Sequence, residues 1–177
     1  MPMKRNCTIP TRGLAGALAL ALLASAPALA QQGESIGSWW FIEMAGAPEP
    51  RHAIMTLSTQ GSGVIAIQCA GGKPTVLVGL NRPEIRPPEG ETALSVELQL
   101  GSGGRQPAQA TRTSEDTIEL DDQASAEILS QAPDAASFAV HLPNGADPDI
   151  ALIFRPVQTK EAIARLQEAC GAPVRPR

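Results

Sequence analysis

The stretch Ile65-Ala66-Ile67-Gln68-Cys69 organises the rest of the chain, because it is an apolar segment that ends in a cysteine. Successive side chains of a β-strand point to opposite faces, so Ile65, Ile67 and Cys69 share one face. That face carries the large aliphatic side chains and therefore belongs to the core. We expect Cys69 to be a structural cysteine whose partner lies elsewhere in the chain.

The expected partner is Cys170, which follows a helical segment near the C-terminus. Ile163, Leu166 and Cys170 recur at i, i+3 and i+7, a spacing that places them on one apolar stripe of a helix. The sequence predicts this helix over Thr159–Ala169, with Thr159 as its N-cap and a glycine just past its end. The stripe turns Cys170 toward the interior.

The N-terminal segment has the features of a secretory signal peptide. Basic residues lead into a short apolar run at 14–23, and Ala28-Leu29-Ala30 fits the A-x-A cleavage pattern. The alternative is a transmembrane anchor, but a span needs roughly 20 apolar residues. We therefore expect removal of residues 1–30, a periplasmic or secreted protein, and no stable membrane insertion after cleavage.

Cleavage removes Cys7 and leaves two cysteines. In an oxidising compartment such a pair most simply forms one disulfide, here Cys69–Cys170. Closing a loop of about 100 residues would stabilise the fold by about 4 to 5 kcal/mol in the chain-entropy model. The alternatives are two buried free thiols or an exchange-active pair. Redox-active cysteines usually lie close together as C-x-x-C, and these two do not.

Cleavage also makes the chain more acidic. The leader carries three of the 14 Lys and Arg residues and none of the 18 Asp and Glu residues, which leaves a net charge of −7. Nucleic acids and anionic membranes bind clustered Lys and Arg, so neither is an expected partner. The remaining length fits one domain over residues 31–171, followed by a disordered tail at 172–177.

Short alternating segments predict the body of this domain. The clearest has Leu94, Val96, Leu98 and Leu100 separated by polar residues. Further strands are expected at 38–44, 53–58, 64–69, 75–80, 106–113, 117–120, 137–142 and 149–155. The fold class is therefore mainly β, an antiparallel β-sandwich or sheet with one C-terminal helix packed on it.

Three local expectations complete this picture. Residues 31–37 are polar and are expected to be loose. Asp122 is expected to cap one or two helical turns at 124–131. In the strand at 137–142, the alternation points His141 outward.

Two surface features are candidate binding sites. Trp39 and Trp40 point to opposite faces of the first strand, so one lies in the core and the other either forms a ligand platform or covers the edge of the core. The proline-rich loop carrying Arg82 and Arg86 is the second candidate, because loops carry binding more often than sheets do.

The sequence carries no motif for catalysis or for a metal. His52 and His141 are the only histidines, and H-E-x-x-H, C-x-x-C, phosphate-loop and G-x-S-x-G patterns are missing. The acidic run at 115–122 lacks the spacing of a calcium loop, and we interpret it as a solvated strand edge followed by a helix cap. No cofactor and no metal are expected.

The layout resembles a family of small exported bacterial proteins. A Trp-bearing first strand, the strand with Ile65, Gln68 and Cys69, and a final helix ending in Ala169-Cys170 are similar to the VasI/TagO-like group associated with type VI secretion. The segment 157–166 also faintly resembles the end of invasion-associated locus B proteins. Both resemblances imply a non-enzymatic envelope protein, and neither supplies a catalytic residue.

The leading hypothesis is an exported binding or accessory module of the cell envelope, linked to secretion or host interaction, with an unknown envelope protein as partner. An alternative is an envelope hydrolase with paired carboxylates drawn from Glu115, Glu119 or Asp122. Another is a structural subunit of an envelope assembly.

A thiol titration tests the pairing of the two cysteines. The mature protein, denatured without reductant, is expected to show no reactive thiol, because both cysteines are consumed in one disulfide. Reductant should then release two thiols. Two thiols in the unreduced sample would contradict the pairing.

Overall fold

The computed structural model describes residues 33–44, 51–70, 72–85, 90–144 and 147–171. Predictions for the leader at 1–30, for the tail at 172–177 and for Arg86 therefore lie outside the described residues. Within the described ranges, no helix is long and apolar enough to cross a bilayer.

Most of the described chain is β-strand. The strands are β1 (Gly33–Ile36), β2 (Trp39–Met44), β3 (Arg51–Leu57), β4 (Gly63–Ala70), β5 (Lys73–Leu80), β6 (Ala93–Leu100), β7 (Gln106–Ser114), β8 (Thr117–Leu120), β9 (Phe138–Asn144) and β10 (Asp147–Phe154). The helices are the short 3₁₀-helix η1 (Pro83–Ile85), α1 (Asp122–Gln131) and α2 (Thr159–Ala169). The predicted mainly β class with a C-terminal helix is confirmed.

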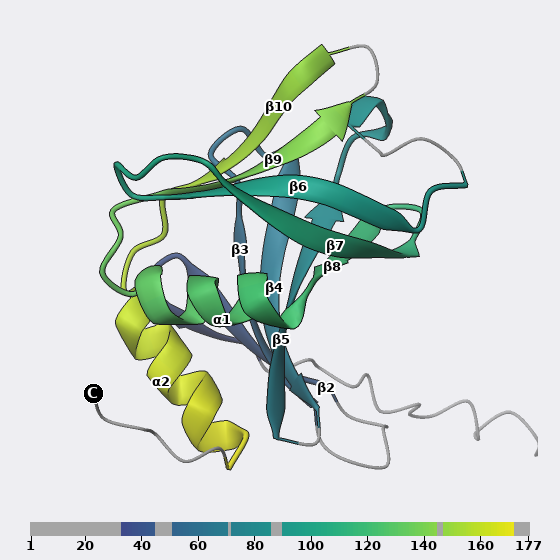
Figure 1. The fold of residues 1–177 in the computed structure, drawn as a ribbon. Coiled ribbons are helices and arrows are strands. Elements are labelled where there is room, and N and C mark those ends of the chain that lie inside the picture. The colour runs from purple at the N-terminus through teal and green to yellow at the C-terminus, as the bar shows by residue number, and fades with distance from the viewer. Residues whose placement is uncertain (1–32, 45–50, 71, 86–89, 145–146, 172–177) are drawn as a thin grey trace, which may run out of the picture. The chain divides into compact units, whose positions relative to one another are not determined.

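All ten strands form one antiparallel sheet in the order β1-β2-β3-β4-β5-β8-β7-β6-β9-β10. The sheet coils, so that β6, β7, β9 and β10 cross over the part formed by β3 to β5 (Figure 1). The N–H of Thr59, in the turn after β3, donates to the carbonyl oxygen of Ile153 in β10 at 2.8 Å. Strand β10, at one end of the sheet, thus contacts the turn after β3, in the other half of the same sheet. One coiled sheet therefore encloses one core.

The core is mostly aliphatic, as the scarcity of aromatic residues requires, and it includes Trp39 and all three phenylalanines. Alternate residues of each strand point inward, which places the apolar members of the predicted alternation on the concave face. The inward residues include Ile54, Ile65, Ile67, Val76, Val78, Leu94, Val96, Leu98, Val140 and Leu152, all of them buried.

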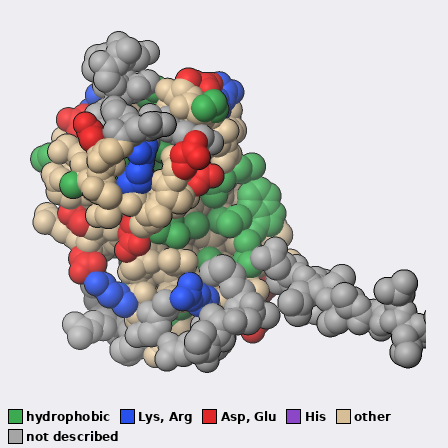
Figure 2. All heavy atoms as spheres, turned by 90° about the vertical axis from the view of Figure 1, so that its right-hand side faces the viewer, with side chains coloured by type: hydrophobic (Ala, Val, Ile, Leu, Met, Phe, Trp, Pro, Cys, Tyr) green, Lys and Arg blue, Asp and Glu red, His purple; other side chains and the backbone are tan. Residues whose placement is uncertain are grey.

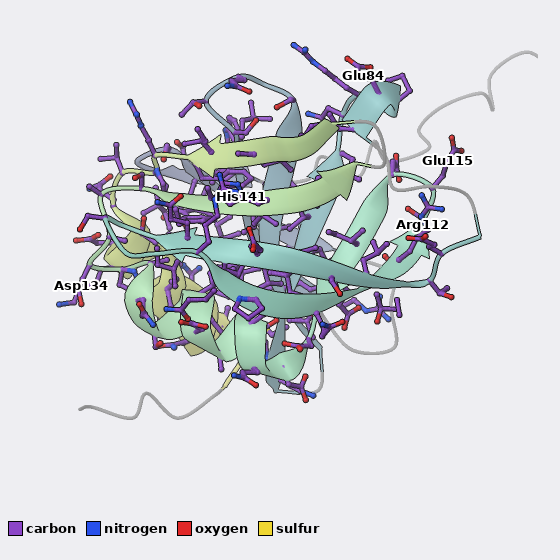
Figure 3. The ribbon with its side chains drawn as sticks, turned by 45° about the horizontal axis from the view of Figure 1, so that its top comes forward. Glu84, Arg112, Glu115, Asp134 and His141 are labelled. Carbon is purple, nitrogen blue, oxygen red and sulfur yellow. A yellow bond between two sulfur atoms is a disulfide. The ribbon has the colours of Figure 1, made fainter. Side chains whose placement is uncertain are left out.

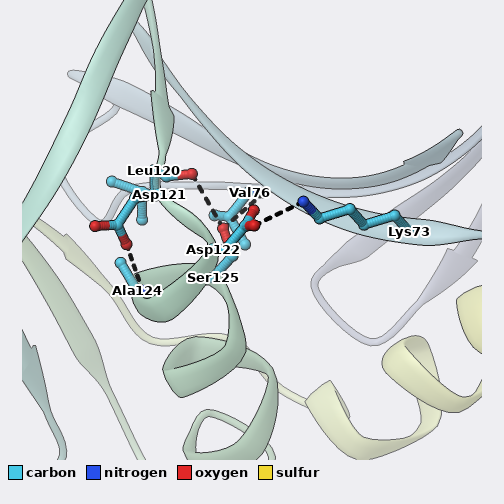
Figure 4. A network of polar contacts seen from close by, with 7 residues as sticks. All are labelled: Lys73, Val76, Leu120, Asp121, Asp122, Ala124 and Ser125. Carbon is cyan, nitrogen blue, oxygen red and sulfur yellow. Dashed lines mark hydrogen bonds and ion pairs between the residues drawn. The ribbon is translucent and has the colours of Figure 1, made fainter. Parts of the chain in front are cut away.

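The N-cap of helix α1 lies one residue earlier than predicted. Asp121, in extended conformation, accepts a hydrogen bond from the N–H of Ala124 at 2.7 Å and is the N-cap (Figure 4). Asp122 was expected in that position, but it is the first helical residue and pairs instead with Lys73 of β5 at 2.7 Å. The prediction for Asp122 is therefore wrong, because the adjacent aspartate has the backbone conformation that a cap requires.

A buried serine joins α1 to the sheet. The hydroxyl of Ser125 donates to the carbonyl oxygen of Leu120 and accepts from the N–H of Val76, each at 3.3 Å (Figure 4). Ala124 and Ile128 of α1 are also buried. Helix α1 therefore packs against the sheet through both polar and apolar contacts.

Helix α2 also begins differently from the prediction. Its N-cap position is Gln158, which has a left-handed backbone (φ 60°) and makes no capping bond through its side chain. Thr159 is the first helical residue, and its hydroxyl accepts a hydrogen bond from the indole N–H of Trp39 at 3.3 Å. The expected cap is thus wrong, because the threonine side chain is turned inward to satisfy a buried tryptophan.

The segment 31–37, expected to be loose, contains strand β1. Each residue of Gly33–Ile36 pairs with β2. The following turn has Gly37 at φ 59°, where an added Cβ would overlap the carbonyl oxygen of Val157. The N–H of Val157 donates to the hydroxyl of Ser38 at 2.8 Å. The expectation fails because pairing with β2 and contact with the segment before α2 fix residues whose own side chains are mostly polar.

The disulfide joins Cys69 in β4 to Cys170 at the end of α2, with a Cα–Cα distance of 6.1 Å. Cys69 is buried on the same face as Ile65 and Ile67. On α2, Ile163 and Leu166 are buried on the stripe that leads to Cys170. The strand alternation that turns Cys69 inward and the helical spacing that turns Cys170 inward are therefore both confirmed by this bond.

The two adjacent tryptophans provide a test of this packing. Trp39→Ala should lower the free energy of unfolding by about 3 to 5 kcal/mol, because Trp39 is fully buried and its removal leaves a cavity. Trp40→Ala should lower it by less than about 1 kcal/mol, because that side chain is 43% exposed. Urea unfolding measures both. Should Trp39→Ala fail to fold, Trp39→Phe keeps one aromatic ring in the site, loses the bond to Thr159 and part of the buried volume, and should cost less than Trp39→Ala. Equal losses at the two positions would contradict the assignment.

Candidate functional site

The strongest candidate site is the outward face of β2, β3, β4 and β5. In the sheet register, Trp40 stands opposite Met55, Met55 opposite Ala66, and Ala66 opposite Leu77. These four residues form one row across four strands. Neighbouring outward positions on the same strands are also apolar. They are Ile42, Ala53, Leu57 and Val64. We call these eight residues the outer apolar face.

Much of this face is open to solvent. Trp40 is 43% exposed and Leu57 is 46% exposed, Ile42, Met55, Val64, Ala66 and Leu77 are half-buried, and Ala53 is buried. Figure 2 shows hydrophobic side chains gathered on one flank of the molecule, on the side away from the helices of Figure 1. A contiguous exposed apolar surface of this kind marks a site of interaction more often than scattered single residues do.

Helix α2 lies on the opposite side of the same strands. The guanidinium of Arg165 stands over the ring of Phe41 at 4.7 Å from its centroid, and Trp39 contacts Thr159. Phe41 and Trp39 alternate with Trp40 along β2, so they face the interior. The packing of α2 therefore covers the inner face of β2 and leaves Trp40 outside.

A signal for this face was present in the sequence. The segment Ala53-Ile54-Met55-Thr56-Leu57 has apolar residues at nearly every position, unlike β6, where polar residues alternate with leucine and valine. Continuous apolar strands are typical of sheets that are covered on both faces. The missing alternation in β3 and β4 therefore places apolar side chains on the second face, against which no helix packs within the described residues.

The other predicted binding residues lie in different settings. Trp39 is fully buried, with its indole N–H bound to Thr159, and it cannot form a surface platform. Of the two tryptophans, Trp39 is therefore the one in the core, and Trp40 stays the candidate for binding. Arg82 lies in the loop after β5 and forms an ion pair with Glu84 at 3.9 Å, while Arg86 lies outside the described residues. Trp40 is thus the predicted residue that the structure places on an apolar surface.

The three carboxylates considered for hydrolysis come from three places. Glu115 lies in the turn between β7 and β8, Asp122 begins α1 and pairs with Lys73, and Glu119 lies on β8 opposite Leu77. Glu119 is half-buried, and within the described residues its carboxylate takes part in no ion pair or hydrogen bond. It continues the row of the outer apolar face as its acidic end.

A hollow of about 260 Å³ between α1 and β7 contains two further carboxylates, Asp121 and Glu127. Asp121 is engaged as the N-cap of α1. Glu127 accepts a hydrogen bond from the side chain of Gln131 at 3.1 Å. Both carboxylates therefore serve the local structure of α1. In the described part of the chain, no group of three or more His, Cys, Asp and Glu residues is arranged to hold a metal ion.

The polar side chains outside this hollow are dispersed. His141 of β9 alternates with the inward-facing Val140 and Leu142, so it has the predicted outward direction. It is nevertheless only 7% exposed, and its Nε2 lies 3.3 Å from the amide oxygen of Gln99. Figure 3 shows Asp134 on the opposite side of the molecule from Arg112 and Glu115.

Comparison with protein-family models, with curated proteins and with solved structures finds no match to this chain. The resemblance to VasI/TagO-like and invasion-associated locus B proteins therefore stays a prediction. Any functional argument must start from the outer apolar face itself.

A dye that fluoresces on apolar surface, such as anilinonaphthalene sulfonate, tests whether this face is open in solution. The double variant Trp40→Asp, Leu57→Asp should lose most of the dye signal of the native protein, because it removes the two most exposed members of the face. The unfolding free energy should change little, since neither side chain is buried. Val157→Asp is the matched control, because Val157 is 61% exposed and lies before α2. An equal loss of signal in the control would contradict the prediction.

Proposed function

We propose that this protein is an exported, non-enzymatic binding module of the bacterial cell envelope that captures a partner protein through the outer apolar face. The observation that carries the proposal is a continuous apolar surface across four strands, with Trp40 and Leu57 both more than 40% exposed. Trp is among the residues that contribute most to binding energy when a partner encloses it.

The energy available at Trp40 is substantial for one residue. A tryptophan buries 150 to 250 Å² when it is enclosed, so its 43% exposed fraction corresponds to about 100 Å². At about 25 cal/mol per Å², covering it contributes roughly 2 to 3 kcal/mol. Leu57 and the half-buried members of the face would add to this.

The build of the molecule suits a rigid binding surface outside the cytoplasm. The signal peptide predicted at residues 1–30 and the disulfide support export, because disulfides persist in oxidising compartments. The same bond ties β4, in the middle of the face, to α2 on the other side of the sheet. A surface fixed in this way loses little conformational entropy when it binds.

Cross-linking in living cells tests the proposal. A photo-reactive amino acid is placed at Trp40 or at Leu57 in the full chain, and at Val157 as the control on a different exposed apolar residue. We expect one defined envelope protein to be linked from Trp40 and Leu57 and not from Val157. Recovery of that protein should survive Trp40→Phe and be lost in Trp40→Asp, since only the second change makes the site polar.

Two results of this experiment would oppose the proposal. Equal labelling from Val157, or no labelled protein from Trp40 and Leu57, would show that the face captures no partner. Linking of the chain only to a second copy of itself would favour the alternative of a structural subunit of an envelope assembly.

A further inference from the structure

We propose that the occupant of the outer apolar face is an amphipathic α-helix of the partner protein, lying along β4 with a Lys or Arg side chain beside Glu119. This inference rests on the proposed function and specifies its ligand. It follows from the size of the face, from its relief, from the hydrogen-bonding needs of the backbone that would lie on it, and from its charge.

The size of the face argues against a second copy of the chain as occupant. The eight positions of the face cover about 250 Å², given strands about 4.8 Å apart and about 6.6 Å between residues on one face. A standard stable interface buries about 800 Å² on each partner. The face is therefore too small for a typical protein dimer, and it matches a single element of secondary structure.

The face carries its smallest side chains near its middle. Ala66 stands between Met55 of β3 and Leu77 of β5, so at this position the side chain of β4 is shorter than both of its neighbours. At the next outward position of β5 lies Gly79, opposite Val64. A helix is about 10 Å across, which equals the distance from β3 to β5. A helix over β4 would thus rest on Ala66 and contact the Met55 and Leu77 side chains along its two sides.

The backbone of the occupant decides between a helix and an extended strand. The face of a sheet offers no free N–H or C=O group, because the backbone groups of its strands hydrogen-bond to the neighbouring strands. An extended segment laid on it would leave its own polar groups unpaired against apolar side chains, at a cost for each group. A helix satisfies these groups internally and presents apolar residues at i, i+3, i+4 and i+7.

The charge on the face indicates that the two sides of the bound helix differ in character. Glu119 follows Leu77 in the row, half-buried and without an ion pair in the described part of the chain. On the other flank, the apolar part of the same row ends in Trp40, and Ser35 of β1 follows it. A helix with a cation on one flank and an apolar side chain on the other complements both. Arg51 and Lys73 lie on this face too, at the far end of β3 and β5, but both are exposed and Lys73 already pairs with Asp122.

A peptide selection tests this proposal. A phage-displayed library of random 16-residue peptides is selected on the folded, oxidised protein and counter-selected on the Trp40→Asp variant. We expect enriched peptides with apolar residues at helical spacing and with Lys or Arg on one flank. Their circular dichroism should show helix on binding, and their affinity for Trp40→Asp should fall at least tenfold.

A charge reversal at Glu119 provides the sharper readout. In Glu119→Lys, the enriched basic peptides should bind at least tenfold more weakly, and peptides with Glu in place of the flanking Lys should recover the loss. Glu161→Lys changes the net charge equally on α2, on the other side of the sheet, and should leave binding unchanged. Glu119→Gln should give an intermediate loss and shows whether the effect needs the reversed charge.

The outcomes separate this inference from the proposed function. The helix proposal would be overturned if the enriched peptides had alternating apolar residues, if no peptide were enriched, or if binding to Glu119→Lys were unchanged. The proposed function would remain supported in these cases if a protein were still cross-linked from Trp40. Dimers that disappear in Trp40→Asp would replace the helix by a second copy. Binding to phosphatidylethanolamine–phosphatidylglycerol vesicles that is lost in the same variant would replace it by a lipid surface. Absence of any cross-linked partner would instead remove the proposed function.

Discussion

The attachment of α2 to the inner side of the sheet is the constraint on which the rest of this structure depends. At its start, the hydroxyl of Thr159 accepts the indole N–H of the buried Trp39. At its end, Cys170 is bonded to Cys69 in β4. Between these points Ile163 and Leu166 pack into the core. One helix, fixed at both ends, thereby determines which side of β2 to β5 is interior, and the side left outside becomes the candidate site.

That division has a functional consequence. The strands β3 and β4 carry apolar side chains on both faces, and α2 covers only one of them. An exposed surface that includes Trp40 and Leu57 is unfavourable in water, and our proposal that a partner covers it rests on this. Two nearby acidic residues have local structural roles, since Asp121 caps α1 and Asp122 pairs with Lys73. Glu119, in contrast, lies beside the apolar row.

The sequence predicted the strands well because alternation of apolar and polar residues is a local property of each strand. It was less successful where a distant contact decides the local structure. Gly33–Ile36 is a strand because β2 pairs with it, and Thr159 is not a cap because Trp39 engages its hydroxyl. His141 is covered although the alternation points it outward. In each case the deciding group lies far away in the chain.

By itself, the sequence determined the mainly β class, the C-terminal helix and the inward direction of both cysteines, since strand and helix periodicities assign side chains to faces without reference to other elements. It also required that Trp39 and Trp40 lie on opposite sides of one strand. Only the tertiary structure decided which of them is buried, because that depends on the side to which α2 packs. The candidate site exists as a surface only after four strands align in register, which no single segment encodes.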